Sequence, residues 1–231
     1  MSITYNTNII QDGLTFHVDA SNKKSYPGSG TTWYDLGPNG INLTWTGTVN
    51  YTTLGGATCF GFNSSMYWTS TTAAAQTTDY RYGTTIELWL YNQTKTVRKT
   101  VFEKSGNAHA SYEQEIAFTW ETNDAISCYR AYNSYDYGSS YALNNNAWNH
   151  VVLVLYPHLA PGYWYVNGVS TGTYTQRALQ LPAVAGAIMI GNGYAGVVDN
   201  GGIAIARTYS RMFDQEDVLQ NFNAMRKRFG L

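Results

Sequence analysis

Short apolar or alternating segments recur from residue 14 onward, and Gly, Asn, Ser or Pro residues separate them. This spacing is typical of an all-β sandwich or barrel. Residues 21–56 show no such segment, and we expect them to be rich in loops. The pattern predicts strands at residues 14–20, 57–63, 84–92, 100–104, 111–121, 125–132, 148–156, 162–167, 169–174, 187–191 and 202–209.

The segment 84–92 shows the alternation most clearly. Successive side chains of a strand point to opposite faces, so one face of this strand is aliphatic while the other is polar but aromatic. The aliphatic face carries Ile86, Leu88 and Leu90, and the other face carries Glu87, Trp89 and Tyr91. The aliphatic face is therefore predicted to belong to the core.

The segment 147–174 predicts three consecutive antiparallel strands. Residues 151–155 are apolar on both faces, which indicates a strand near the middle of a sheet with its second face covered as well. Asn167 and Gly168 favour a two-residue type I′ turn, because both central residues of that turn need a positive φ. We expect this turn to join the second and third strands.

One short helix is predicted at the C-terminal end. Asp214 suits the N-cap and Asp217 follows three residues later, as in a capping box. The basic run 226–228 falls in the predicted last turn, where cations complement the helix dipole, and Gly230 ends the helix. The apolar side of this helix is formed by Val218, Leu219, Phe222 and Met225.

The composition agrees with one all-β domain over residues 1–231, since sandwiches of this length commonly stay undivided. Charged residues make up only 13% of the chain, against roughly 25% in an average globular protein. The surface must therefore be built from Thr, Ser, Asn and Tyr, which suit strands and polar loops. Cys59 and Cys128 match no zinc or redox spacing, and we expect two buried thiols rather than a disulfide.

The charge and hydropathy patterns exclude several kinds of partner. The net charge is −1 and no basic cluster precedes residue 226, which argues against binding to nucleic acid or to an anionic membrane. No apolar stretch approaches the roughly 18 residues that cross a bilayer, so we expect no membrane insertion. The N-terminal residues lack the basic and apolar regions of a secretory signal.

Five segments carry a resemblance that extends over nearly the whole chain. They are GLTFHVDASNKKSYPGSGTTWYDLGPNG (13–40), TIELWLYN (85–92), WNHVVLVL with the later YWYVNG (148–168), IMIGN (188–192) and GIAIARTYSRMFDQEDVLQNFNAMRKRFG (202–230). Together they resemble a laminin-G-like domain of the concanavalin A-like lectin/glucanase superfamily. The resemblance is closest to stand-alone versions of this domain in structural proteins of tailed bacteriophages.

The resemblance implies a jelly-roll sandwich of two antiparallel sheets with a short C-terminal helix. It also implies binding of carbohydrate or of another protein, in some members with a calcium ion at the rim of the sandwich. The fold alone does not decide the function, because it serves lectins, glycosidases and purely structural proteins. The function must therefore be argued from candidate sites.

A glycosidase site has little support in the sequence. Glycoside hydrolysis needs two carboxylates about 5 to 9 Å apart, and laminarinase-type members of the superfamily carry Glu-x-Asp-x-x-Glu on one strand. The nearest match is Glu113 and Glu115, but Ala117 and Phe118 follow, so the Asp and the third acid are missing. We interpret this pair as solvated charge and expect no enzyme activity.

The histidines offer no alternative catalytic or metal motif. His17, His109, His150 and His158 have no ligand spacing. His150 shares a strand face with Trp148 and Val152, so we interpret it as a packed, hydrogen-bonded residue rather than a base.

The candidate carbohydrate site is a tyrosine-rich segment expected to be a loop. Sugars pack their C–H faces on aromatic rings, while polar side chains bind their hydroxyl groups. A protein interface explains the segment equally well, because tyrosine is also enriched in interfaces. The candidate residues are Tyr132, Asn133, Tyr135, Asp136, Tyr137 and Tyr141.

Calcium is the one candidate cofactor. It takes six to eight oxygen ligands, which loops distant in the sequence can supply together. Asp and Asn also favour turns, so the same residues have a purely structural explanation. The candidate ligands are Asp19 after the first strand, Asp35 and Asn39 in the following loop, and Asp199 beside Asn200.

These observations predict a non-enzymatic jelly-roll protein of a bacteriophage virion, as a capsid decoration or a tail or fibre component. We expect it to bind carbohydrate or the host surface, to form homo-oligomers and to contact other virion proteins. A cell-surface or secreted lectin is the first alternative and a glycoside hydrolase the second. Lack of a secretory signal agrees with assembly in the host cytoplasm.

Overall fold

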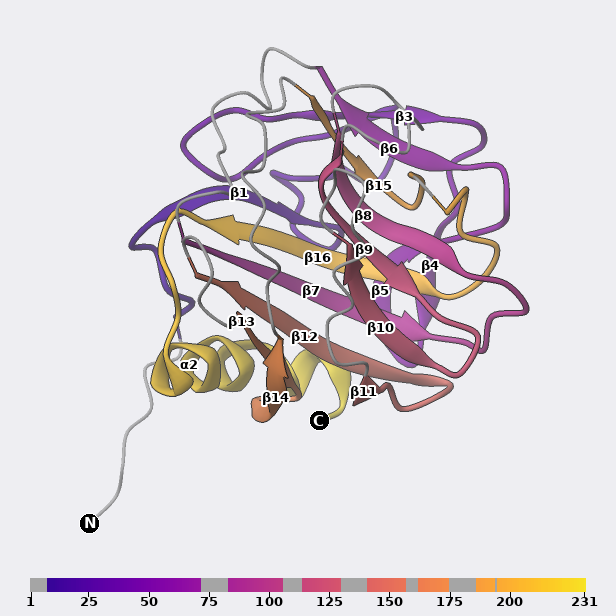
Figure 1. The fold of residues 1–231 in the computed structure, drawn as a ribbon. Coiled ribbons are helices and arrows are strands. Elements are labelled where there is room, and N and C mark those ends of the chain that lie inside the picture. Colours follow the sequence, from indigo (N-terminus) through magenta and orange to yellow (C-terminus); the bar gives the residue numbers. More distant parts are fainter. Residues whose placement is uncertain are drawn as a thin grey trace.

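The computed structural model describes residues 8–71, 83–105, 114–129, 141–156, 162–174, 186–193 and 195–231. In these ranges the chain forms two antiparallel sheets and a short C-terminal helix (Figure 1). The strands are β1 (Leu14–Asp19), β2 (Thr32–Trp33), β3 (Leu43–Thr46), β4 (Tyr51–Leu54), β5 (Ala57–Gly61), β6 (Tyr67–Ser70), β7 (Thr84–Asn92), β8 (Lys99–Ser105), β9 (Gln114–Trp120), β10 (Ala125–Tyr129), β11 (Tyr141–Ala142), β12 (Ala147–Leu155), β13 (Gly162–Val166), β14 (Val169–Tyr174), β15 (Ala187–Ile190) and β16 (Gly202–Tyr209). The helices are α2 (Gln215–Met225) and the 3₁₀ helix η1 (Arg226–Phe229). The predicted all-β jelly-roll sandwich is confirmed.

Each sheet contains eight strands. Sheet A has the order β14-β13-β12-β7-β16-β5-β4, and β1 also pairs with β16. Sheet B has the order β11-β10-β9-β8-β15-β6-β3-β2. Both sheets also pair strands that are distant in the sequence, such as β7 with β16 and β8 with β15, so each sheet is assembled from several parts of the chain.

Every predicted strand segment contains a strand of the structure, but the prediction missed five strands. Three of them, β2, β3 and β4, lie in the segment expected to be loop-rich, and the others are β6 and β11. These five are two to four residues long, and all but β11 mix Thr or Ser with aromatic residues, as in Leu-Thr-Trp-Thr of β3. A segment this short has too few positions to show an alternation of period two.

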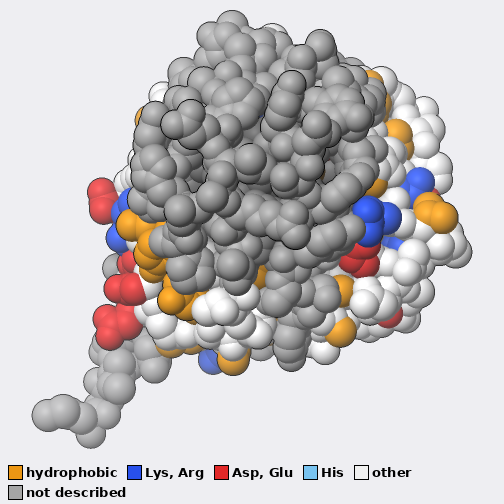
Figure 2. Space-filling model, viewed as in Figure 1, with side chains coloured by type: hydrophobic (Ala, Val, Ile, Leu, Met, Phe, Trp, Pro, Cys, Tyr) orange, Lys and Arg blue, Asp and Glu red, His pale blue; other side chains and the backbone are white. Residues whose placement is uncertain are grey.

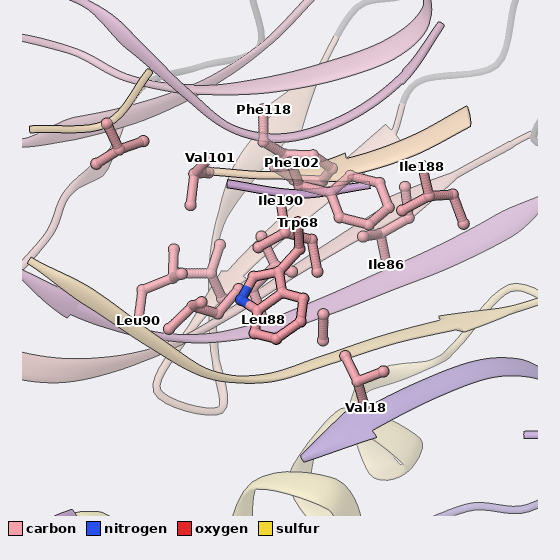
Figure 3. Close-up of a cluster of buried hydrophobic side chains, with 14 of the residues drawn as sticks. Val18, Trp68, Ile86, Leu88, Leu90, Val101, Phe102, Phe118, Ile188 and Ile190 are labelled. Carbon is pink, nitrogen blue, oxygen red and sulfur yellow. The ribbon is translucent and has the colours of Figure 1, made fainter. Parts of the chain in front are cut away.

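The main hydrophobic core lies between the inner faces of the two sheets (Figure 3). Ile86, Leu88 and Leu90 of β7 are fully buried there, as the alternation predicted. They face aliphatic and aromatic side chains of sheet B, among them Phe102 and Phe118, whose ring centroids are 6.0 Å apart. Cys59 and Cys128 are both buried and lie in different sheets.

The segment around β12 has the predicted architecture. β12 pairs with β7 on one side and with β13 on the other, and its odd and even residues enter different hydrophobic clusters. Asn167 and Gly168 have φ values of 52° and 79°, as the predicted type I′ turn requires. Gly168 also lies against the α2 side chain of Phe222, where an added Cβ would come within 2.9 Å.

Helix α2 and η1 cover the outer face of sheet A, below β12 and β13 in Figure 1. Asp214 caps α2 through the backbone N–H groups of Glu216 and Asp217, and Asp217 completes the predicted capping box. The basic run 226–228 lies in η1 rather than in the last turn of α2, and Gly230 follows it with a φ of 72°. Trp89 stacks on Phe229 with ring centroids 4.1 Å apart, so the aromatic face of β7 is a second buried face.

Within the described part of the chain, no helix combines the length and the apolar character that a membrane crossing requires.

Candidate functional site

One end of the sandwich gathers uncharged polar side chains. This is the end where β7 stops and β12 and β16 start, on the right of Figure 1. We call it the amide rim and define it as residues 92–98, 121–124, 143–146 and 195–201. Its amide side chains are Asn92, Gln93, Asn123, Asn144, Asn145, Asn146 and Asn200. The rim also contains the charged residues Lys95, Arg98, Glu121, Asp124 and Asp199, and Figure 2 shows basic and acidic side chains on the right-hand side of the molecule.

Hydrogen bonds between side chains tie three loops of the amide rim together. Asp124 accepts from Asn92 Nδ2 at 3.2 Å and from the Thr94 hydroxyl at 3.3 Å. Asn145 accepts from the backbone N–H of Thr94 at 3.1 Å, and its Nδ2 donates to the Thr94 hydroxyl at 2.6 Å. Because each loop is held by another, the exposed groups of the rim have fixed positions.

Lys95 links the rim to the core. Its side chain is only 2% exposed, and its ammonium group donates to the Gln93 carbonyl and to Asn200 Oδ1. The ammonium also lies 4.2 Å from the ring centroid of the buried Trp120, within cation–π distance. Burial lowers the pKa of Lys95 from 10.5 to about 8, although Asp199 and Asp124 act in the opposite direction.

Gly201 allows this close packing beneath the rim. Its φ is +85°, and a Cβ at this position would lie 2.7 Å from the Tyr91 carbonyl oxygen and 3.3 Å from the Trp120 ring. Its N–H donates to Gln93 Oε1 at 2.9 Å. Any larger residue would push the chain before β16 away from Trp120.

The outer surface of the rim retains polar groups that face solvent. Thr94, Asn123, Asn144, Asn145 and Asn146 are all exposed. Neutral amides and hydroxyls both donate and accept hydrogen bonds, which is what recognition of a sugar hydroxyl needs. The arrangement therefore suits a neutral polyol or sugar better than it suits an ion.

Of the four predicted calcium ligands, the structure places only Asp199 in the amide rim. Its Oδ1 is buried and has no hydrogen-bond partner among the described residues. Asp19 forms an ion pair with Arg228 at 2.8 Å. Asp35 accepts from the backbone N–H groups of His17, Gly37 and Ile41 at 2.7–2.8 Å, and Asn39 donates to the Thr15 carbonyl at 2.9 Å.

These contacts give Asp35 and Asn39 a structural task in one loop, and the four predicted ligands do not meet around one point. Among the described residues, no group of three or more His, Cys, Asp or Glu side chains could hold a metal ion. Calcium binding stays a prediction, since carbonyl and amide oxygens could also contribute ligands.

The tyrosine-rich segment connects to the amide rim. Tyr132, Asn133, Tyr135, Asp136 and Tyr137 lie outside the described residues, as does Glu113 of the acid pair. Tyr141 begins β11, whose backbone pairs with Ile126 of β10. The chain then enters rim residues 143–146.

A second polar cluster, which we call the Glu87 cluster, lies beneath α2 and was missed by the sequence reasoning. Glu87 is fully buried and accepts from Arg207 Nη1 at 2.8 Å and from Asn221 Nδ2 at 2.7 Å. His150 Nε2 lies 3.1 Å from Glu87 Oε1, and the Tyr209 hydroxyl donates to Oε2 at 3.4 Å. Every residue of this cluster is at most 1% exposed, so a dissolved ligand has no access to it.

Electrostatics show how the cluster tolerates a buried charge. Burial alone would raise the pKa of Glu87, but Arg207 and the hydrogen bonds from His150 and Asn221 hold it below its usual range. Burial and Glu87 raise the pKa of Tyr209. Burial and Arg207 lower the pKa of the neighbouring His17 to about 3. The cluster thus contains an ionised carboxylate paired with arginine, and its task is to hold α2 on sheet A.

The predicted packed role of His150 is confirmed by this cluster, since its ring also lies 4.7 Å from the Trp89 ring. The alternation of β7 gave no sign that Glu87 is buried. The only available signal was the second apolar face of 151–155, which already required a cover over this side of the sheet.

The two sheets, the core between them and the C-terminal helix define a lectin-like β-sandwich. The family model of the concanavalin A-like lectin/glucanases superfamily (Laminin_G_3) matches residues 63–219, more than half of the chain, and the protein belongs to this family. No curated protein matches its sequence.

Solved structures of similar fold are distant in sequence. The binding domain of botulinum neurotoxin DC in complex with SialylT has a TM-score of 0.70 and 13% identity, over 93% of this chain and 52% of that chain. The same domain in complex with rat synaptotagmin II has a TM-score of 0.68 and 14% identity, over 94% and 52%. Trypanosoma rangeli sialidase with the inhibitor DANA has a TM-score of 0.63 and 14% identity, over 93% and 33%. The chain spans about a third of the sialidase and about half of the neurotoxin chain, and these likenesses concern the fold alone.

Proposed function

We propose that the protein binds carbohydrate without catalysing a reaction, through the amide rim and the tyrosine-rich segment that leads into it. The observation that carries this proposal is the exposed array of Asn and Thr side chains, held in place by Asp124 and Lys95. Preorganised neutral donors and acceptors match sugar hydroxyls without a large ordering cost. The lectin-like family and a neighbour solved with SialylT support the same proposal.

Three described carboxylates have structural contacts, which supports the proposal that the protein does not catalyse a reaction. Glu87 is enclosed and paired with Arg207, Asp35 binds three backbone N–H groups, and Asp124 accepts from two rim side chains. A glycosidase instead needs one carboxyl group with a raised pKa and a second acid facing it across the substrate. The proposal therefore predicts sugar binding with no release of product.

We further propose that the particle carrying this module is a bacteriophage virion, in which it decorates the capsid or belongs to the tail or its fibres. The resemblance of the five sequence segments to phage structural proteins supports this assignment. A surface with few charges suits lasting contacts with sibling subunits. A closed oligomer in light-scattering measurements would agree with a virion component, whereas a monomer would favour a free lectin.

The test is binding to an array of glycans that includes bacterial surface polysaccharides, with calcium and again with a chelator. Asn145→Ala removes an exposed rim amide, and we expect it to weaken capture by about tenfold, since an unpaired sugar hydroxyl loses one to two hydrogen bonds. Asn223→Ala on α2 is the matched control and should leave capture unchanged. If the folded protein binds no glycan on the array, the proposal is contradicted. Release of free sugar from a bound glycan would contradict its non-enzymatic part.

A further inference from the structure

An ion pair joins the C-terminal turn to the end of the first strand. Arg228 of η1 places Nη1 2.8 Å from both carboxylate oxygens of Asp19, the last residue of β1. Asp19 also accepts from the backbone N–H of Ser21 at 2.9 Å. Residues about 210 positions apart in the sequence are therefore held side by side, with their neighbours on one part of the surface.

The loop after β1 presents two lysines at this junction. Asn22 organises the turn, because its carbonyl accepts from the N–H groups of Ser25 and Tyr26 at 2.8 Å. Lys23 and Lys24 stand on this turn and are exposed. The Lys23 ammonium group lies 6.0 Å from the centre of the Tyr51 ring. The charge of Arg228 lowers the pKa of the same tyrosine, although burial raises it more, so Tyr51 lies near both basic segments.

Arg226 and Lys227 extend the positive charge on the other side of the junction. Both are exposed, and they directly precede Arg228. We call Lys23, Lys24, Arg226 and Lys227 the basic patch. None of the four forms an ion pair with any described residue. Of the five Lys and Arg residues at the junction, only Arg228 has an acidic partner in the described part of the chain, and that partner is Asp19.

An exposed ring and an acid, Tyr34 and Asp35, follow the lysine turn in the chain. Asp35 directs its carboxylate at three backbone N–H groups, which disperse its charge. Tyr34 precedes it and is 43% exposed, and its N–H donates to the Ser25 carbonyl at 2.7 Å. An exposed ring therefore lies next to the lysine turn. Aromatic rings accept the C–H face of a sugar, while ammonium and guanidinium groups bind its anionic substituents.

We propose that the basic patch, together with Tyr34, is a binding site for an acidic polysaccharide that carries carboxylate or phosphate groups. The site uses other residues than the amide rim and goes beyond the neutral sugar binding proposed there. The chain as a whole has a net charge of −1, so this group of cations is a local feature that would attract a polyanion.

The charge count favours a saccharide over nucleic acid. Only four cations without an ion pair among the described residues meet here, and nucleic-acid binding surfaces rely on many phosphate contacts and a strongly basic domain. Outside this junction, the longest basic run in the sequence is the pair Arg98 and Lys99. Four cations and one aromatic ring are enough to bind a short stretch of a glycan that carries a few anionic groups.

The experiment measures binding of the full chain to polygalacturonate, which carries carboxylates, and to poly(glycerol phosphate), which carries phosphates. Neutral dextran and an oligothymidine strand are the controls. Two double variants remove one half of the patch each: Lys23→Gln with Lys24→Gln, and Arg226→Gln with Lys227→Gln. Lys99→Gln, at the start of β8, is the matched control for loss of a lysine elsewhere.

We expect saturable binding to at least one of the two acidic polymers, weakened by added salt, and none to dextran. Each double variant should bind about tenfold more weakly, since an exposed cation contributes a factor of about three. Lys99→Gln should bind within twofold of the original chain. The two polymers show whether carboxylate or phosphate is the preferred group.

Several results would overturn the proposal. The proposal is overturned if the protein binds neither polymer at low salt. It is also overturned if the protein binds oligothymidine as tightly as, or more tightly than, the acidic polymers. Loss in only one double variant would show that the two segments do not form one site. Each variant is checked by its circular dichroism spectrum and its unfolding midpoint, and Tyr34→Ser provides a charge-neutral test that should also weaken binding. Neutral glycans on the array report on the amide rim separately, so the two proposals can fail independently.

Discussion

The Glu87 cluster and the amide rim are both networks of polar side chains, but they differ in their access to water. Beneath α2, the charges of Glu87 and Arg207 are 0–1% exposed and directed at each other. At the rim, Asn145 and Thr94 bind each other with one side and face solvent with the other.

This difference separates stability from recognition. A buried polar group must find its partners within the fold, so a closed network specifies how the elements pack. An exposed group can exchange water for a ligand at little cost. Lys95 stands between the two cases, because its ammonium is buried like Glu87 while its acceptors belong to the rim.

The largest effect should come from breaking the closed cluster. Glu87→Gln removes the negative charge with little change in shape and leaves Arg207 buried without its counter-ion. We expect a loss of about 3–5 kcal/mol in the free energy of unfolding, measured with a chemical denaturant. Adding Arg207→Met should recover part of it. A loss no greater than that of the exposed control Glu216→Gln would contradict the closed, paired cluster.

The second largest effect should be the pH dependence of stability that the buried Lys95 causes. Its folded pKa of about 8 lies below the usual 10.5, so between these values the unfolded chain holds more protons and stability rises with pH. Relative to Lys95→Met, the original protein should gain about 3 kcal/mol between pH 8 and 10.5. Denaturant titrations of both proteins across this pH range measure the difference between their free energies of unfolding. The tyrosines titrate in both proteins, so their contributions cancel in this difference. A constant difference would mean that the lysine is not buried.

The third largest effect should be a loss of stability in acid, caused by His17 beside the Glu87 cluster. The pKa of His17 is lowered to about 3 from 6.5, so its stabilising contribution is complete above pH 6.5 and is lost as the pH falls toward 3. Glu87 begins to contribute to acid unfolding only below about pH 4.3, the usual value for glutamate. From pH 6.5 to 4.5 we expect the original protein to lose about 2 kcal/mol relative to His17→Gln. Parallel stability curves for the two proteins would disprove this.

The open rim should show the smallest effect on stability. Asn123→Ala removes an exposed amide, and we expect the free energy of unfolding to change by less than about 0.5 kcal/mol. Glycan capture should fall in the same variant if the rim is a recognition surface. A stability loss comparable to that of Glu87→Gln would show that the rim is as closed as the cluster beneath α2.

The prediction from sequence succeeded where the structural signal is local. The alternation of β7, the Asn167–Gly168 turn and the Asp214 cap each depend on residues within one element. It failed for β2, β3 and β4, whose two to four residues are paired by neighbours from elsewhere in the chain. Placement of the candidate site was partial, because Asp199 lies in the rim while Asp19 and Asp35 have other contacts.

The sequence by itself therefore determined the longer strands of the core, the hairpin, the helix and its N-cap. Only the tertiary structure decided that Glu87 meets Arg207 and Asn221, and that Arg228 pairs with Asp19. The physical reason is that local patterns report how one residue lies relative to its near neighbours. Contacts between polar groups distant in the chain depend on the order of strands in each sheet, which the packing of the whole core selects.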